Sequence, residues 1–428
     1  MSLPQFDISG DKALLDSIRA AFPRMKGDPN DDASIIADLI LEYCGREGAS
    51  DIHLEPKSDY VTARMRVDGI LRDVLRYAKT EFPIGAKFRV LAGFSPQSAV
   101  AYTPEDGRFQ LQIEGRSIQV RVSTFPTLHG EKLVMRILDM GSGAGNLETL
   151  GFSDGMLPRV RKLISSPSGL FIVSGMTGCG KTTTLAGVLQ ELSSPERNIM
   201  TIEDPVEYEL PLVTHSQVNT RAGFGFAEAL RNILRQDPNI IMLGEIRDRE
   251  TAEIALRAAT SGHMIFSTVH APTTTGVIHR LLSMEVEPYM IASSLTGVLA
   301  QRLARRVCPA CALPSSSDMN FFQEIFRTLD SSQVPVVAEL VKSRDARFLK
   351  AKGCPQCGFT GYKGRIGIFE LFEVGPDTRQ MIFENSKSGI KEIQAAAIAS
   401  GMKPLIVDAI EKIRLGITTQ EEVSRIVI

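Results

Sequence analysis

The chain has 428 residues, of which 43% are hydrophobic and 23% charged, and its formal net charge is −2 at pH 7. This length predicts two or three domains, and the near-neutral charge gives no overall support for nucleic-acid binding. No apolar run reaches the roughly 18 residues of a transmembrane helix, and the first residues lack the features of a signal peptide. These properties favour a cytosolic protein over a secreted or membrane-spanning one.

The N-terminal third of the sequence predicts a mobile arm followed by a small α+β domain. Residues 1–30 carry several prolines around one amphipathic stretch, and we expect there a mobile arm or a small helix that docks elsewhere. From residue 31 onward, apolar residues at helical spacing predict a helix capped by Asp31 or Asp32. Apolar and polar residues then alternate, as in the strands of a largely antiparallel sheet, at 49–56, 61–69 and 116–123.

A glycine-rich segment at 141–145 marks a linker, and the sequence after it alternates between strand and helix patterns. The predicted strands are 169–174, 198–203, 213–218, 239–243 and 263–269. The predicted helices are 181–193, 225–236, 249–260 and 286–305, and the end of the chain, 366–428, has a helical pattern throughout. Repeated strand–helix units predict a mostly parallel sheet covered on both faces, with ligands at the carboxyl ends of its strands.

A phosphate-binding loop follows the first of these strands. Gly175, Gly180, Lys181 and Thr182 fit the P-loop pattern, which predicts a site for a nucleoside triphosphate such as ATP. Glycines let backbone N–H groups surround phosphate oxygens, Lys181 reaches the β- and γ-phosphates, and the Thr182 hydroxyl ligates Mg²⁺. An ordinary glycine turn is the weaker alternative. The predicted nucleotide-binding residues are Gly175, Met176, Thr177, Gly178, Cys179, Gly180, Lys181, Thr182 and Thr183, with Cys179 as an unreactive filler.

Two later strands each end in an acidic residue. The strand before Glu203 and Asp204 delivers carboxylates to the side of the sheet where the P-loop lies, and Glu203 can polarise the attacking water. Four apolar residues and a glycine precede Glu245, an arrangement that brings an acid to Mg²⁺ or its waters. When either stretch is considered alone, the alternative interpretation is an ordinary acidic turn at the protein surface.

Two histidines flank the strand predicted at 263–269, so they lie at opposite ends of it rather than in one metal site. His270, at the carboxyl end, is placed to sense the γ-phosphate. His263 more plausibly fixes a neighbouring loop.

Four of the six cysteines form two Cys-x-x-Cys pairs, Cys308 with Cys311 and Cys354 with Cys357. Four thiolates suit tetrahedral Zn²⁺, and four cysteines leave no open position for catalysis. The pattern therefore predicts a structural zinc site, with a redox pair or four unrelated thiols as the competing interpretations.

Together these motifs resemble those of the secretion ATPases that drive type II secretion and type IV pilus assembly. The matching stretches cover nearly the whole chain after residue 30: 49–56, 64–69, 121–127 with 130–131, the P-loop, 202–208, 235–239, 244–248, 263–270, the tetracysteine region, 401–402 and 416–423.

The resemblance implies a fold class: an α/β, RecA-like P-loop NTPase domain, a smaller N-terminal α+β (PAS-like) domain and an inserted zinc subdomain. The implied divisions are a mobile arm at 1–30, the PAS-like domain at 31–140, a linker at 141–150 and the ATPase domain at 151–428. The ATPase domain includes a zinc-binding subdomain at 303–365 and C-terminal helices at 366–428.

The resemblance also implies roles for individual residues and partners. Glu203 is then the general base, Glu245 serves Mg²⁺ through water, and Arg121 and Arg136 reach the phosphates from the N-terminal domain. The implied assembly is a homohexamer, cytoplasmic and peripheral at the inner membrane, that works on a platform protein there; a membrane adaptor with a cytoplasmic domain is a further possible partner.

The zinc insertion favours assembly over pilus retraction. A conjugative-type secretion ATPase, a nucleic-acid translocase and a silent nucleotide-binding scaffold are the competing functions. No nucleic-acid partner is expected, because the sequence has no basic, aromatic-interleaved groove.

Overall fold

The structure is a computed structural model that describes residues 28–79, 83–95, 103–139, 145–329, 333–343, 346–384 and 389–427. The chain divides into two compact units, residues 1–142 and 143–428. Most of the predicted arm, residues 1–27, lies outside the described residues. Within the described ranges, no helix combines the length and apolar character needed to cross a membrane.

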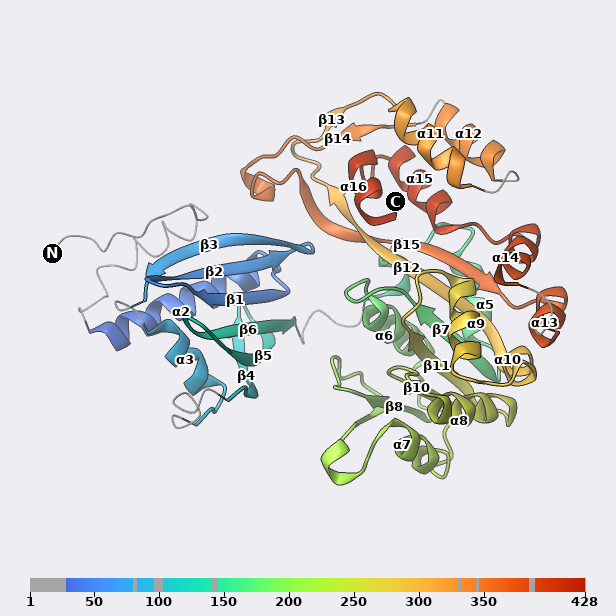
Figure 1. The fold of residues 1–428 in the computed structure, drawn as a ribbon, viewed down its shortest axis with the longest axis horizontal. Helices are drawn as coiled ribbons and strands as arrows, with labels where there is room; N and C mark the ends of the chain where they lie inside the picture. The colour runs from blue at the N-terminus through green and yellow to red at the C-terminus, as the bar shows by residue number, and fades with distance from the viewer. Residues whose placement is uncertain are drawn as a thin grey trace. The chain divides into compact units, whose positions relative to one another are not determined.

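The first unit is an antiparallel sheet with two helices. The strand order is β3-β2-β1-β6-β5-β4, and the helices α2 and α3 supply much of the core under the sheet (Figure 1). The bounds are α2 Pro29–Arg46, β1 Asp51–Pro56, β2 Tyr60–Val67, β3 Ile70–Ala78, α3 Ile84–Leu91, β4 Asp106–Ile113, β5 Arg116–Thr127 and β6 Gly130–Asp139. This matches the α+β pattern expected for this part of the chain.

The predicted helix cap in the first unit was wrong. Helix α2 begins at Pro29, so Asp31 and Asp32 lie in its first turn, and Asp28 accepts a hydrogen bond from the Asp31 N–H at 3.4 Å. Acidic side chains are favourable in a first helical turn as well as at a cap, so the sequence pattern alone did not separate the two positions.

The second unit is built on a seven-stranded sheet of order β15-β12-β7-β11-β10-β8-β9. Its strands are parallel apart from the antiparallel edge strand β15. The strand bounds are β7 Gly169–Ser174, β8 Ile199–Glu203, β9 Val213–Gln217, β10 Ile240–Leu243, β11 Met264–Val269, β12 Leu295–Val307 and β15 Tyr362–Glu373. This parallel, P-loop-type arrangement confirms the expected α/β fold class.

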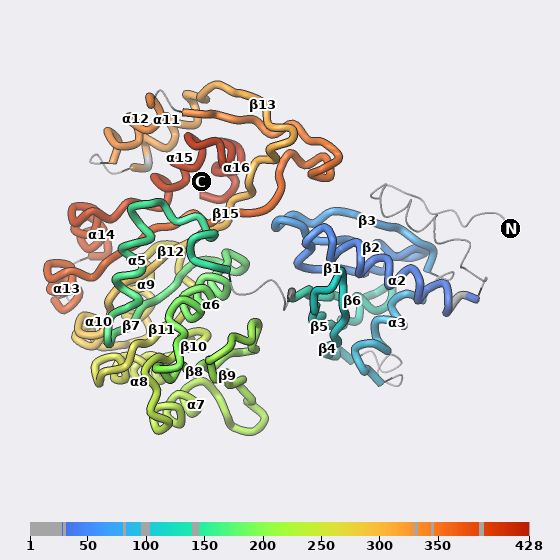
Figure 2. The backbone as a smooth tube through the Cα atoms, turned by 180° about the vertical axis from the view of Figure 1, so that it is seen from behind, coloured from blue at the N-terminus to red at the C-terminus, as the bar shows by residue number. Residues whose placement is uncertain are grey.

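Helices cover both faces of this sheet, as Figure 1 and the reverse view in Figure 2 show. One face packs against α5 Leu157–Ile164 and α6 Lys181–Leu192. The other face packs against α7 Phe226–Ile233, α8 Arg249–Thr260, α9 Thr274–Ser283, α10 Pro288–Ser294, α13 Pro376–Phe383 and α14 Ile390–Ala399. The sheet is therefore buried on both sides, which explains the continuous apolar runs in its strands.

A smaller core surrounds the far ends of β12 and β15. It contains the helices α11 Met319–Thr328, α12 Val334–Lys342, α15 Leu405–Arg414 and α16 Gln420–Val427. The short strands β13 Leu313–Pro314 and β14 Leu349–Lys350 lie at the same end of the unit (Figures 1 and 2).

Two stretches predicted as helix are strands. Residues 295–305, from the predicted helix 286–305, lie in β12, and residues 366–373, from the predicted C-terminal helices, lie in β15. Leu, Ala, Gln and Arg dominate β12 and favour helices, but pairing with β7 on one side and β15 on the other overrides that preference. Both stretches are buried on both faces, so neither shows the alternation that identifies a strand.

The predicted linker also ends earlier than expected. Leu147 starts a short 3-10 helix, Leu147–Thr149, and is fully buried in the core beside α6. Asn146 caps this turn by accepting from the Glu148 N–H at 3.1 Å. Leu147 therefore anchors this stretch to the second unit.

Candidate nucleotide site and cysteine cluster

The P-loop connects β7 to α6 through three glycines in left-handed backbone conformations. Gly175, Gly178 and Gly180 have φ values of 145°, 77° and 90°. A Cβ on Gly175 would lie 2.5 Å from Cys179 Sγ and 2.6 Å from the carbonyl oxygen of Gln301. Only glycine fits at position 175, and loops of this kind can turn their backbone N–H groups toward phosphate oxygens.

The positive end of α6 and the Lys181 ammonium group face this loop. Gly180 is the N-cap of α6 and supplies no side-chain hydrogen bond to the helix. The first backbone N–H groups of α6 can therefore bind an anion. Lys181 Nζ donates to the carbonyl oxygens of Gly175 at 2.9 Å and Met176 at 3.2 Å. Burial lowers the pKa of Lys181. The loop and the lysine therefore fit the phosphates of a nucleotide.

Cys179 is buried inside the loop, and burial raises the pKa of its thiol. A protonated, buried thiol is a poor nucleophile, which agrees with its interpretation as a filler.

Gln301 is a P-loop contact that the sequence did not indicate. It is 2% exposed on β12, and its Nε2 donates to the Cys179 carbonyl oxygen at 2.7 Å. Its Oε1 accepts from Thr184 Oγ1 on α6 at 2.9 Å. The loop is thereby fixed to the neighbouring strand; Gln301 was missed because β12 was predicted as a helix.

Glu245 and His270 lie at the carboxyl ends of β10 and β11. His270 Nε2 is 3.7 Å from Glu245 Oε2. Both groups interact electrostatically with Lys181: burial and the lysine charge lower the pKa of His270, and Lys181 helps to lower that of Glu245. The structure thus brings these three predicted residues together at the P-loop edge of the sheet.

Arg247 is a second residue, after Gln301, that contacts the predicted site residues although the sequence did not indicate it. Its guanidinium group donates a short hydrogen bond to Glu245 and is the main cause of the lowered Glu245 pKa. The same guanidinium group lies 3.9 Å from Asp204 Oδ2. Arg247 therefore stands between the carboxylates that follow β8 and β10.

Glu203 is the last residue of β8 and is 5% exposed. Its Oε1 accepts from Thr201 Oγ1 at 2.7 Å and lies 2.8 Å from Nδ1 of His215 on β9. His215 lies in the predicted strand 213–218, but no sequence motif marked it. Glu203 is thus a buried carboxylate supplied with hydrogen-bond partners, at the sheet edge that also carries the P-loop.

His263 occupies the opposite end of β11 from His270, as expected. Its ring nitrogen Nδ1 is 3.1 Å from the Ala258 carbonyl oxygen and 3.3 Å from Ser261 Oγ. These contacts join the end of α8 to the start of β11, which is a loop-fixing arrangement.

Arg121 and Arg136 are direct partners on the adjacent strands β5 and β6 of the first unit. Arg136 Nε also lies 3.2 Å from Asp51 Oδ1 on β1. The structure brings these two arginines together on one sheet. Their contact with phosphates bound in the second unit stays a prediction.

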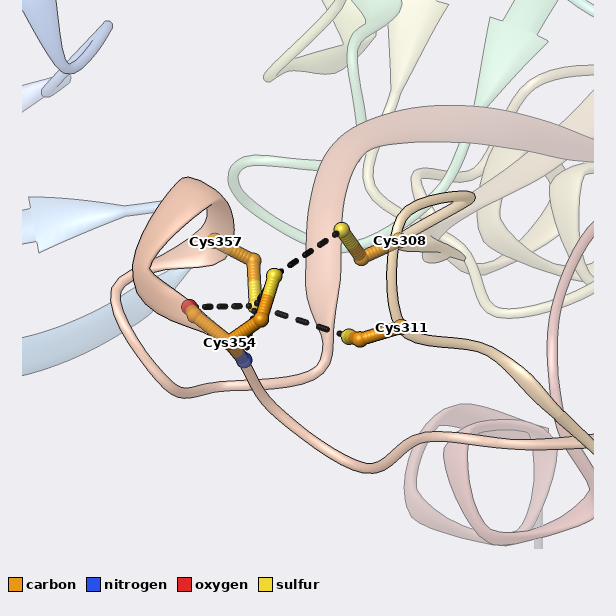
Figure 3. A group of neighbouring side chains, drawn as sticks. All are labelled: Cys308, Cys311, Cys354 and Cys357. Atoms are coloured by element: carbon orange, nitrogen blue, oxygen red, sulfur yellow. Dashed lines mark hydrogen bonds between the residues drawn. The ribbon is translucent and has the colours of Figure 1, made fainter.

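The four cysteines converge on one point from two segments, as Figure 3 shows. Cys308 and Cys311 follow β12, and Cys354 and Cys357 precede β15; all four sulfur atoms lie within 4.8 Å of one another. The closest Sγ–Sγ separations are 3.8 to 4.0 Å.

These separations fit a tetrahedral zinc ion and exclude a disulfide. A tetrahedron with Zn–S bonds of about 2.3 Å has sulfurs about 3.8 Å apart, whereas bonded sulfurs are about 2.05 Å apart. The backbone N–H groups of Cys354 and Gly361 each lie 3.2 Å from Cys357 Sγ. Burial alone would raise the pKa of that thiol, but these two N–H groups, together with hydrogen bonds from the Cys354 and Cys311 side chains, lower it to about 6, which favours the thiolate.

The fold and the P-loop define this chain as a P-loop ATPase whose sheet carries acids at its carboxyl edge. A family model described as type II/IV secretion system protein matches residues 29–425. The chain is 40% identical over 425 residues to the type II secretion system ATPase E of Vibrio cholerae, covering 98% of this chain and 81% of that protein. It is 42% identical over 385 residues to the type IV pilus assembly ATPase PilB of Thermus thermophilus, covering 90% and 42% respectively.

The fold agrees with these sequence matches. The crystal structure of the ATPase DotB of Legionella pneumophila superposes with a TM-score of 0.67 at 20% identity, covering 91% of this chain and 95% of that one. The chain belongs to the type II/IV secretion system protein family and is a secretion ATPase. The suspected family resemblance and the predicted ATP hydrolase activity are confirmed.

Proposed function

We propose that this secretion ATPase is an assembly motor that hydrolyses Mg·ATP to drive a type II secretion pseudopilus or a type IV pilus. The proposal rests on one arrangement of side chains. Lys181, Glu245 and His270 lie together beside the P-loop, and Glu203 lies at the end of β8, the parallel strand next to β10. Parallel strands bring their carboxyl ends to one edge, so these groups surround one phosphate site.

In this proposal Lys181 and the N–H groups of the loop bind the β- and γ-phosphates. Glu203 takes a proton from the water that attacks the γ-phosphorus, the terminal P–O bond breaks, and ADP leaves. Thr182 and Glu245, the latter through water, would hold Mg²⁺, which neutralises phosphate charge when bound. His270 senses the γ-phosphate.

Arg121 and Arg136 are proposed to complete the site from the PAS-like domain, 31–140. An arginine that offsets transition-state charge is worth about 10³–10⁵ in rate. Their adjacency on β5 and β6 supports a shared role, since both guanidinium groups start from one patch of the sheet.

The four cysteines are proposed to bind one structural Zn²⁺. The metal would join the two ends of the segment between β12 and β15, a segment that the β13–β14 pair and the core around α11 and α12 also hold. The relatives named as type II secretion and pilus assembly ATPases, together with this cysteine cluster, favour assembly over retraction.

The working form is proposed to be a homohexamer on the cytoplasmic side of the inner membrane. Its partners would be a platform protein of the secretion or pilus machine and a membrane adaptor with a cytoplasmic domain.

The test is ATP hydrolysis per protomer, measured against protein concentration for the wild type, Lys181→Ala and Glu203→Gln. We expect a specific rate that rises with concentration, no activity in Lys181→Ala, and ATP binding without turnover in Glu203→Gln. Normal turnover in Glu203→Gln would remove Glu203 as the base. A rate independent of concentration, with or without lipid vesicles, would contradict sites completed by assembly.

A further inference from the structure

His215 lies beside the proposed general base on the outermost strand of the sheet. In the parallel pairing of β8 with β9, His215 stands opposite Thr201, and Gln217 stands opposite Glu203. Residues Thr201, Glu203 and His215 therefore share one face of the sheet. That is the face that packs against α6, the helix that follows the P-loop.

The hydrogen bonds of the imidazole define which nitrogen carries the proton. The backbone N–H of Leu210 donates to His215 Nε2 at 3.0 Å, so Nε2 is an acceptor. In the neutral ring the proton is then on Nδ1, which lies 2.8 Å from Glu203 Oε1 and 3.0 Å from Thr201 Oγ1. His215 is consequently a donor to the carboxylate.

Both side chains that donate hydrogen bonds to the Glu203 carboxylate bind the same oxygen, Oε1. Among the described residues, the side-chain hydrogen bonds of Glu203 come from Thr201 at 2.7 Å and His215 at 2.8 Å, and each reaches Oε1. A carboxylate that is 5% exposed requires such donors, because a buried charge without hydrogen bonds is costly. Both donors hold Oε1, and no side-chain hydrogen bond to Oε2 is seen within the described residues.

We propose that His215 is a positioning residue for ATP hydrolysis: it anchors Oε1 of Glu203 so that Oε2 accepts the proton of the attacking water. The inference rests on the proposed role of Glu203. During the step the water oxygen bonds to the γ-phosphorus, the bond to the ADP oxygen breaks, and the water proton moves to Oε2. His215 keeps its Nδ1 proton throughout and transfers none.

His215 also connects the base to the segment that follows it. The Leu210 N–H that fixes the ring belongs to the stretch between β8 and β9, and Tyr208 in the same stretch lies 3.4 Å, hydroxyl to hydroxyl, from Thr183 on α6. The imidazole thus contacts both the base and the loop beside the P-loop helix. The two contacts use different nitrogens, so substitutions can separate them.

The test compares His215→Leu with His215→Asn in the full chain under assembling conditions. Leucine fills similar volume but donates no hydrogen bond. Asparagine places its Nδ2 near the position of Nδ1 and keeps the donor to Glu203, while neither residue accepts from Leu210 as Nε2 does. His215→Phe is a second variant without a hydrogen-bond donor, and it replaces the leucine variant if that one does not fold.

We expect kcat to fall by about 10- to 100-fold in His215→Leu, the usual cost of losing a supporting hydrogen bond. KM and the affinity for a fluorescent ATP analogue should stay within about twofold, because the interaction acts on the reacting water rather than on binding. His215→Asn should recover most of kcat.

Three outcomes would overturn the inference. Unchanged kcat in His215→Leu, with an inactive Glu203→Gln, would show that the base does not need this anchor. Equal losses in the asparagine and leucine variants would assign the effect to the Leu210 contact instead. An active Glu203→Gln would show that the proposed base itself is wrong, and the anchor with it.

Discussion

Gln301 of β12 and Thr184 of α6 are joined by a buried hydrogen bond of 2.9 Å, although they lie on elements far apart in the chain. The same Gln301 side chain donates to the Cys179 carbonyl oxygen inside the P-loop at 2.7 Å. One amide therefore holds both the loop and the helix that would bind the phosphates.

Replacement of Gln301 by leucine should weaken nucleotide binding. The change leaves the Thr184 hydroxyl and the Cys179 carbonyl oxygen buried without this partner, at about 1–3 kcal/mol for each such group. We expect the affinity for a fluorescent ATP analogue to fall by roughly 10- to 100-fold. The exposed Gln380→Leu serves as the control, and equal affinities in the two variants would contradict a role for Gln301 in shaping the loop.

Alanine at Gly175 and at Gly178 should have different effects, although both glycines have positive φ. A Cβ at Gly175 meets Cys179 Sγ at 2.5 Å and the Gln301 carbonyl oxygen at 2.6 Å, whereas a Cβ at Gly178 meets no atom within 4 Å. Gly178→Ala should therefore cost about 1 kcal/mol of backbone strain, and Gly175→Ala should also displace the loop. Measurement of ATP affinity should find a loss that is much greater in Gly175→Ala.

Mass spectrometry of the native protein should find one zinc ion per protomer, and Cys311→Ser should lose it. The four sulfurs lie within 4.8 Å of one another, so removal of one breaks a four-coordinate site. Cys44→Ser is the matched control, because Cys44 is buried outside the cluster. Limited proteolysis should then cut between residues 308 and 357 in Cys311→Ser alone. Full zinc content in that variant would exclude this site.

Glu422→Gln should destabilise the second unit in a pH-dependent way. Glu422 is buried and accepts from Arg305 of β12 at 2.7 Å and from Arg425 at 2.5 Å. Burial alone would raise the pKa of Glu422, but the hydrogen bonds from these arginines have the larger effect and lower that pKa below 4.5. Its contribution is therefore present at neutral pH and is lost as pH falls below about 4.5.

Breaking such a buried pair costs about 3–5 kcal/mol. Thermal unfolding at pH 7 should show this loss in Glu422→Gln, with a smaller difference from the wild type in acid. The exposed neighbour Glu421→Gln should change little at either pH. A constant difference across pH would mean that the ion pairs do not carry the effect.

Motifs with fixed spacing could be located from the sequence. The P-loop, the acids at the ends of β8 and β10, and the paired cysteines were found because each chemistry requires particular residue types at short separations. The alternating strand and helix pattern around them was sufficient for the α/β class.

Contacts made between distant segments were not predictable in the same way. Gln301 reaches the P-loop only because β12 pairs with β7, and a local helical preference concealed that strand. His215 meets Glu203 only through the register of β8 with β9. Neither position carries a local pattern, so tertiary pairing alone reveals it.

Strand β12 also has a mechanical consequence. It is 13 residues long, pairs with β7 as far as Ala300, touches the P-loop at Gln301, and ends at Val307, next to Cys308. From Gln301 to Cys308 is about 23 Å of extended chain, stiffened by antiparallel pairing with β15. Apart from a register shift between Arg305 and Val307, hydrogen-bonded backbone connects the cysteine cluster to Gln301, whose side chain contacts the P-loop. A load applied at the cluster would therefore be transmitted along this strand toward the nucleotide site.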